Sequence, residues 1–115
     1  MKLEAKKYLF DMREASLLVR EFAQDNTLDS FRNDVMPKSA IERQLFIIGE
    51  ALQQLDKRYP DVANRIPNHR SIINFRHILA HGYNRVEDEV TWGIVENEIS
   101  PLLNELEKLL NEPED

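Results

Sequence analysis

Apolar residues recur every three or four positions along almost the whole chain, and this spacing constrains the fold more than any other feature. No stretch sustains the alternation of apolar and polar residues that marks a half-buried strand. The chain also has no Asn-Gly or Asp-Gly pair of the kind that closes a β-hairpin. Residues three and four apart share one face of a helix, so the pattern predicts an all-α fold. We expect an up-down helical bundle of four main helices joined by short helical turns.

The ends of these helices are predicted from capping and helix-breaking residues. The main helices are expected at residues 2–24, 37–57, 69–81 and 88–111, with short turns near 28–32 and 60–67. Pro37 suits the first position of its helix, and Asp88 suits the N-cap of the last one. Gly82 is expected to close the third helix in a left-handed conformation, and Pro101 to kink the fourth.

The first expected helix is apolar on two sides. One side carries a row at spacings of three and four, formed by Ala5, Tyr8, Met12, Ala15, Val19 and Phe22. A second row, formed by Leu3, Phe10 and Leu17, lies nearly opposite at 100° per residue. One row is expected to face the core, which leaves the other for a second subunit.

The second main helix is expected to be the central one, because its apolar stripe is the most regular in the chain. The stripe consists of Ile41, Leu45, Ile48, Leu52 and Leu55. Gly49 interrupts this helix at a cost of about 1 kcal/mol relative to alanine. Either another backbone approaches closely there, or the cost is simply tolerated.

Length and composition predict a single helical domain over residues 1–112, with a frayed tail at 113–115. Cysteine is absent, which excludes disulfides and thiolate chemistry. The longest fully apolar run is residues 45–48, far too short to cross a membrane, and the N-terminal segment lacks the apolar core of a secretory signal. A cytoplasmic protein without membrane contact is therefore expected.

The charge is unevenly distributed. A net charge of −6 argues against a broad nucleic-acid surface, since such binding depends on Lys and Arg neutralising phosphates. Residues 62–86 nevertheless contain no acidic residue, and they hold all three histidines together with Arg65, Arg70, Arg76 and Arg85. We call this segment the basic island. It would allow the protein to meet one phosphate while rejecting long tracks of them.

Within the basic island, Arg76 and His81 suit phosphodiester chemistry. Arginine holds a phosphate through two parallel hydrogen bonds, whatever the pH. A histidine in the last turn of a helix lies near the negative end of the helix dipole, which favours its protonated form. The two residues are five positions apart, or about 140° of helical rotation, so they share a face only through the length of the arginine or a relaxed last turn.

Other interpretations of these residues remain open. Arg76 and His81 would also be unremarkable as a helix cap and a solvated surface. His77 and His81 stand four apart, as in H-E-x-x-H metal sites, but Ile78 replaces the glutamate and a third ligand would have to come from elsewhere. No metal or other cofactor is therefore expected. Tyr83 could simply pack on the bundle, whereas Glu50 could reach the basic island and orient a histidine or an arginine.

Three segments together resemble a known family. AIERQLFIIGEAL (40–52), FRHILAHGY (75–83) and the V-x-x-E-V-T-W opening of the last helix (86–92) occur in the order found in HepT-like toxins. These toxins belong to the HEPN superfamily of helical ribonucleases. The resemblance extends from Met12 to about Leu106 and includes the proline within the last helix.

The resemblance implies a metal-independent endoribonuclease that is the toxin of a toxin–antitoxin pair. Arg76, His77, His81 and Tyr83 occupy the family's motif positions, although His77 stands where asparagine is more frequent. By analogy, His81 is the general acid/base and Arg76 the phosphate clamp, with the RNA 2′-hydroxyl as nucleophile. Such toxins are homodimers, and their antitoxin is a small nucleotidyltransferase that transfers AMP to the motif tyrosine, here Tyr83.

A second function remains compatible with the sequence. The chain could be a noncatalytic helical subunit that holds a nucleotide or a nucleotidyltransferase without cutting RNA. The net charge of −6 keeps this alternative open, because an efficient ribonuclease usually attracts its substrate more strongly.

Overall fold

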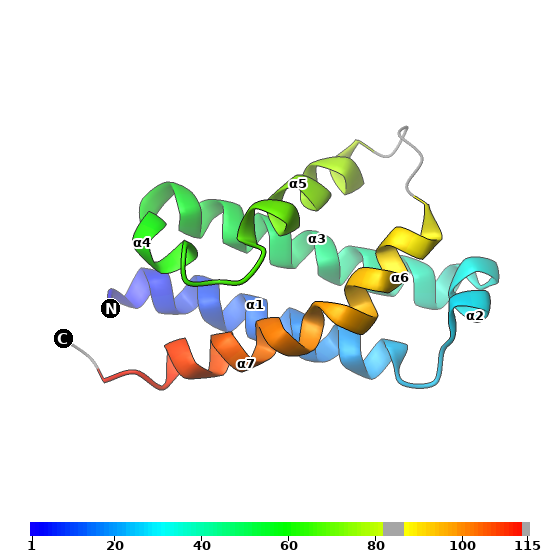
Figure 1. Cartoon of the computed structure of the whole chain (residues 1–115), viewed down its shortest axis with the longest axis horizontal. Coiled ribbons are helices and arrows are strands. Elements are labelled where there is room, and N and C mark those ends of the chain that lie inside the picture. Colours follow the sequence, from blue (N-terminus) through cyan, green and yellow to red (C-terminus); the bar gives the residue numbers. More distant parts are fainter. Residues whose placement is uncertain (82–86, 114–115) are drawn as a thin grey trace.

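The structure, a computed structural model, describes residues 1–81 and 87–113. Within those ranges it contains helices and no strand, which confirms the predicted all-α fold (Figure 1). The helices are α1 (Leu3–Ala23), α2 (Leu28–Asn33), α3 (Val35–Arg58), α4 (Pro60–Ala63), α5 (His69–Ala80), α6 (Asp88–Asn97) and α7 (Ile99–Leu110).

The central helix is α3, as expected from its regular apolar stripe. It packs against α1 on one side and against α5 on another, while α7 lies along α1 (Figure 1). The short helix α2 lies at the end of the bundle between α3 and α6. Among the described helices, α5 is thus attached to the body of the protein mainly through α3.

The core forms where the predicted stripes meet. All five stripe residues of α3 are buried, as are Ala5, Met12, Ala15 and Val19 of α1 and Leu102, Leu106 and Leu109 of α7. The aromatic rings of Phe31 and Trp92 pack with their centroids 5.3 Å apart and join α2 to α6. These burials confirm the predicted core faces of α1 and α3, although Tyr8 and Phe22 of the α1 row are only half-buried.

The second apolar row of α1 lies on the outside of the chain. Leu3 is 82% exposed, Phe10 45% and Leu17 43%. Exposed apolar residues grouped on one helix face, rather than scattered singly, often mark an interaction surface. Packing within the described part of the chain therefore does not explain why these three positions are apolar.

Two helices begin differently from the prediction. Helix α3 begins at Val35, so Pro37 is its third residue rather than its first; the Asp34 carboxylate caps the helix by accepting from the Met36 N–H at 3.3 Å. Proline is tolerated there because the first N–H groups of a helix have no partner within the helix. Asp88 is not an N-cap either: it is the first residue of α6, and its carboxylate pairs with Lys38 at 2.8 Å.

The last predicted helix is two helices instead of one kinked helix. Helix α6 ends at Asn97, and α7 begins at Ile99 after a turn at Glu98. Pro101 lacks the N–H that would bond to the carbonyl of Asn97, and its ring disfavours a continuous helix at that point. The break therefore precedes the proline by three residues.

No helix in the described part of the chain is long and apolar enough to cross a membrane. The predicted roles of Gly82 and Tyr83 fall in residues 82–86, and most of the predicted tail falls in residues 114–115. Both segments lie outside the described residues.

Candidate active site

Helix α5 approaches α3 closely at Gly49, and this contact positions Arg76. A Cβ atom at Gly49 would lie 2.9 Å from Cγ of Arg76, closer still to Cβ of Arg76, and 3.3 Å from the carbonyl oxygen of Ile72. A glycine is required there because the stem of Arg76 occupies the space that a side chain would fill. The first alternative from the sequence, a close approach of another backbone, is confirmed.

The guanidinium of Arg76 is held by Glu50, which lies one residue after Gly49 on α3. Its Nε donates to Oε2 of Glu50 at 2.8 Å, and its Nη2 lies 2.6 Å from the same oxygen, as an ion pair. The guanidinium carbon also lies 5.0 Å from the centroid of the Phe46 ring. One edge of the guanidinium, formed by Nε and Nη2, therefore faces the Glu50 carboxylate, and Nη1 lies outside this ion pair. The predicted reach of Glu50 to an arginine of the basic island is confirmed as a contact.

His77 lies beside the other edge of this guanidinium. Its Nδ1 is 3.4 Å from Nη1 of Arg76, and its side chain is half-buried. The structure thus brings three predicted residues together, namely Glu50, Arg76 and His77. A fourth, Tyr83, lies outside the described residues.

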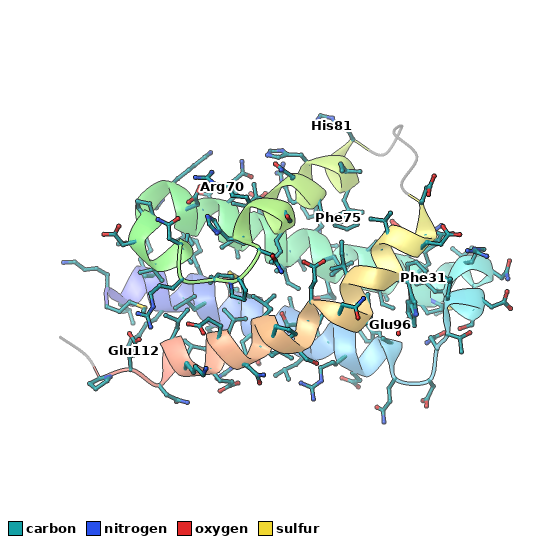
Figure 2. The ribbon with its side chains drawn as sticks, in the orientation of Figure 1. Phe31, Arg70, Phe75, His81, Glu96 and Glu112 are labelled. Carbon is teal, nitrogen blue, oxygen red and sulfur yellow. The ribbon has the colours of Figure 1, made fainter. Side chains whose placement is uncertain are left out.

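His81 lies at the exposed end of α5, one residue past its last helical position (Figure 2). Its backbone N–H donates to the carbonyl of His77 at 3.2 Å, and its φ and ψ angles of −97° and 70° depart from the helix. The predicted relaxation of the last turn therefore occurs at His81 itself. Among the described residues, the side-chain partners of Arg76 are Glu50, His77 and Phe46, and not His81.

The basic island is compensated in space by carboxylates from α3 and from the segment after α7. Arg65 pairs with Glu112, Arg70 lies 3.5 Å from Asp56, and Arg76 pairs with Glu50. The absence of acidic residues from this segment of the sequence therefore does not produce an unpaired cationic surface in the part of the chain that the structure describes. Any anion that binds here meets a guanidinium already held in place, rather than a diffuse positive patch.

An open groove lies next to Arg76. It has a volume of about 370 Å³ and is lined by Glu42, Arg43 and Phe46 of α3 and by Leu79 and Ala80 of α5. The analysis of the sequence did not identify Phe46 or Arg43. Their positions three apart on α3 could have indicated a shared face. The proximity of Phe46 to Arg76 is concealed by their separation of 30 positions in the sequence.

The described residues hold no cluster of three or more acidic, histidine or cysteine side chains that could bind a metal.

A comparison of the sequence with models of protein families identifies the family of this chain. A model described as "Ribonuclease HepT-like" matches residues 12–109. The chain belongs to the HepT-like ribonuclease family. The matched segment contains Gly49, Glu50, Arg76 and His81, so the site described above lies wholly within the HepT-like region.

Curated relatives of this HepT-like chain carry similar names. "Probable ribonuclease HepT" of Thermococcus cleftensis is 34% identical over 109 residues, which are 95% of this chain and 98% of that protein. "Putative RNase MJ0127" of Methanocaldococcus jannaschii is 27% identical over 98% of this chain and 93% of its own length. A third protein, "Gamma-glutamylcyclotransferase and putative RNase MJ0434" of the same organism, is 31% identical over 97% of this chain.

The chain spans only 50% of that third relative, so the likeness concerns one half of a longer protein. No solved structure matches the chain.

Proposed function

We propose that this HepT-like chain is a metal-independent endoribonuclease that cuts RNA through Arg76 and His81. The observation that carries the proposal is the arrangement of Arg76: Glu50 holds Nε and Nη2, and Nη1 is directed toward His77 on the helix that ends at His81. A guanidinium fixed along one edge can donate to a phosphate through its other edge without losing its position. Membership of a ribonuclease family supports RNA as the substrate.

The proposed reaction needs no water and no added cofactor. The 2′-oxygen of the ribose attacks the adjacent phosphorus, and the bond from phosphorus to the 5′-oxygen of the next nucleotide breaks. The proton lost by the 2′-hydroxyl is balanced by one given to the 5′-oxygen. His81 acts as the general acid or base in this exchange, and Arg76 stabilises the charge on the phosphate oxygens. His77 supports Arg76 at the phosphate. The products are a 2′,3′-cyclic phosphate and a 5′-hydroxyl.

A cleavage assay with the purified chain tests the proposal. Single-stranded RNA incubated with a chelator present is expected to be cut, and the 5′-fragments are expected to end in a 2′,3′-cyclic phosphate. Intact RNA after incubation, over a range of salt concentrations, would favour the noncatalytic binding subunit instead. Cleavage that stops when the chelator is added would contradict the metal-independent mechanism.

We further propose that the chain is the toxin of a cytoplasmic toxin–antitoxin pair, neutralised by a nucleotidyltransferase. The support is the family together with the position of Tyr83, two residues past His81 in the sequence. AMP transferred to the Tyr83 hydroxyl would add a phosphate two residues from His81 in the sequence, and its negative charge would oppose the entry of RNA. After co-expression with the nucleotidyltransferase, the intact mass is expected to rise in AMP-sized steps. A Tyr83→Phe variant that still gains mass would place the acceptor elsewhere.

The exposed row of Leu3, Phe10 and Leu17 supports a homodimer. These side chains are apolar, lie on one face of α1 and are exposed among the residues that the structure describes. Burying them against a second copy would remove apolar area from water, which stabilises association. Sedimentation velocity is expected to give the mass of two chains. A monomer at all micromolar concentrations would contradict the dimer.

Glu50 is expected to act as a positioning residue for Arg76. The Glu50→Ala change frees the guanidinium, and we expect the cleavage rate to fall by about 10- to 100-fold, the size of effect that a small misplacement produces. A comparison of kcat with KM separates the two effects, because a mobile Arg76 still attracts RNA but aligns it poorly. Loss of kcat with KM little changed is therefore expected.

The matched control for this change is Glu4→Ala. The Glu4 carboxylate accepts a hydrogen bond from Arg58 at 3.1 Å, on a surface away from α5. The Glu4→Ala change therefore also breaks an ion pair between a glutamate and an arginine. We expect unchanged cleavage by Glu4→Ala. Equal losses in both variants would mean that Glu50 contributes only to general stability.

A further inference from the structure

The groove beside Arg76 has the features of a binding site for one unpaired base. Three of its lining residues belong to α3, and the other two, Leu79 and Ala80, directly precede His81 on α5. Its walls therefore come from α5, which carries Arg76 and ends at His81, and from α3, which carries Glu50. A nucleotide whose phosphate reached Arg76 would have its base close to this opening.

Phe46 is the aromatic wall of the groove. Its ring is half-buried, with the guanidinium carbon of Arg76 5.0 Å and that of Arg43 5.7 Å from the centroid. Bases of single-stranded RNA stack on aromatic rings and on guanidinium planes alike. Arg76 is fixed by Glu50, whereas Arg43 is exposed and has no carboxylate partner among the described residues. Arg43 can therefore move aside for a base and then cover it.

Glu42 supplies a hydrogen-bond acceptor in the same groove. Its carboxylate is half-buried and has no hydrogen-bond partner among the residues that the structure describes. Burial raises the pKa of this carboxyl, opposed in part by nearby Lys38. A carboxylate that is partly desolvated and has no hydrogen bond is stabilised when a ligand donates one to it. The amino groups of adenine and cytosine are such donors, whereas uracil presents a carbonyl oxygen in their place.

We propose that this groove holds one unpaired base of the RNA, stacked on Phe46 and bonded to Glu42, and that it favours adenine or cytosine over uracil. The inference rests on the proposed function for the neighbouring phosphate position. It adds a specificity determinant to the cleavage site, formed by Glu42, Arg43 and Phe46. These residues act on the base, while Arg76 and His81 act on the phosphate.

Binding can be measured separately from cleavage. RNA with 2′-O-methyl groups lacks the nucleophile and stays intact, so hexanucleotides of A, C or U with this modification are suitable probes. A Phe46→Trp variant reports stacking through quenching of its fluorescence, with the wild-type chain correcting for buried Trp92. We expect saturable quenching by the A and C hexamers, and about tenfold weaker binding of the U hexamer. Glu42→Gln should narrow this difference, because an amide also donates to uracil.

Variants of Phe46 show whether stacking carries the effect. Phe46→Leu keeps an apolar side chain but removes the ring, and we expect about tenfold weaker binding and slower cleavage. Phe46→Trp keeps an aromatic face, so its binding and its cleavage rate should lie closer to those of the wild-type chain than those of Phe46→Leu do. The control is Phe22→Leu, which makes the same change at a half-buried phenylalanine of α1, away from the groove, and should bind and cleave as the wild-type chain does.

The outcomes separate this inference from the proposed function. If the wild-type chain cuts RNA but Phe46→Leu cuts at the same rate with the same base preference, the base site is wrong and the ribonuclease remains. If free AMP quenches Phe46→Trp as tightly as the hexamer does, the groove is a mononucleotide site and the inference is wrong. If no RNA is cut but the hexamers quench with the expected preference, the base site stands and the proposed reaction is wrong.

Discussion

Replacing His81 with alanine is expected to lower the rate of RNA cleavage by about 10²- to 10⁴-fold, the usual contribution of a general acid or base. The loss should appear in kcat, because the phosphate is still held by Arg76 and the base groove is unchanged. His81 lies at the exposed end of α5, outside the core, so the free energy of unfolding should hardly change. Single-turnover cleavage and denaturant unfolding of the same preparation measure the two quantities.

His69 provides the matched control, because it lies at the opposite end of the same helix. The His69→Gln variant removes an imidazole from α5 but not from the proposed site, so its cleavage rate should equal that of the wild-type chain. Full activity in His81→Ala would reject His81 as the proton-transfer group. Equal losses in both variants would point to a general effect on α5 rather than to catalysis.

Replacing Gly49 with alanine should both destabilise the protein and reduce cleavage. The added Cβ overlaps Cβ and Cγ of Arg76 and crowds the carbonyl of Ile72. These atoms are the stem of a side chain and a backbone oxygen, so α5 itself has to move away from α3. Overpacking of this kind costs about 1–3 kcal/mol. Because Arg76 moves with α5, its contact with Glu50 also weakens, and cleavage should fall by about 100-fold.

Gly93 on α6 is the control for this change. A Cβ at Gly93 would meet no atom of the described residues within 4 Å, so Gly93→Ala gains helix propensity without a clash. We expect it to raise the free energy of unfolding by about 0.5–1 kcal/mol. The two alanine substitutions at helical glycines should thus change the free energy of unfolding in opposite directions. If Gly49→Ala is as stable as the wild-type chain, the close approach of α5 to α3 is wrong.

The sequence predicted most of the fold because helical periodicity is local. The stripe from Ile41 to Leu55 repeats at the spacing of a helix face, and each member is buried as expected. Helix ends were predicted less well. A helix starts within two residues before Pro37 and also before Pro101, so a proline alone does not specify the first residue of a helix. At α3 the capping carboxylate of Asp34 specifies it.

The candidate site was predicted only in part. The spacing of Arg76, His77 and His81 is readable along one segment, and Glu50 was a candidate partner. Phe46 and Arg43 were missed, since their relation to Arg76 exists only after α5 packs on α3. The segment without acidic residues looked like a positive patch, but carboxylates from α3 and from the C-terminal end compensate its described arginines.

The amino-acid sequence by itself determined the helical class, the core-facing stripes and the short motif that holds the arginine and the histidines. Each of these depends on residues within a few positions of one another, so the geometry of a single helix is enough to derive them. The tertiary structure alone decided that Arg76 is held by Glu50, that Gly49 makes room for it, and that Phe46 forms a groove beside it. Those relations join residues 26 or more positions apart, and the packing of two helices creates them.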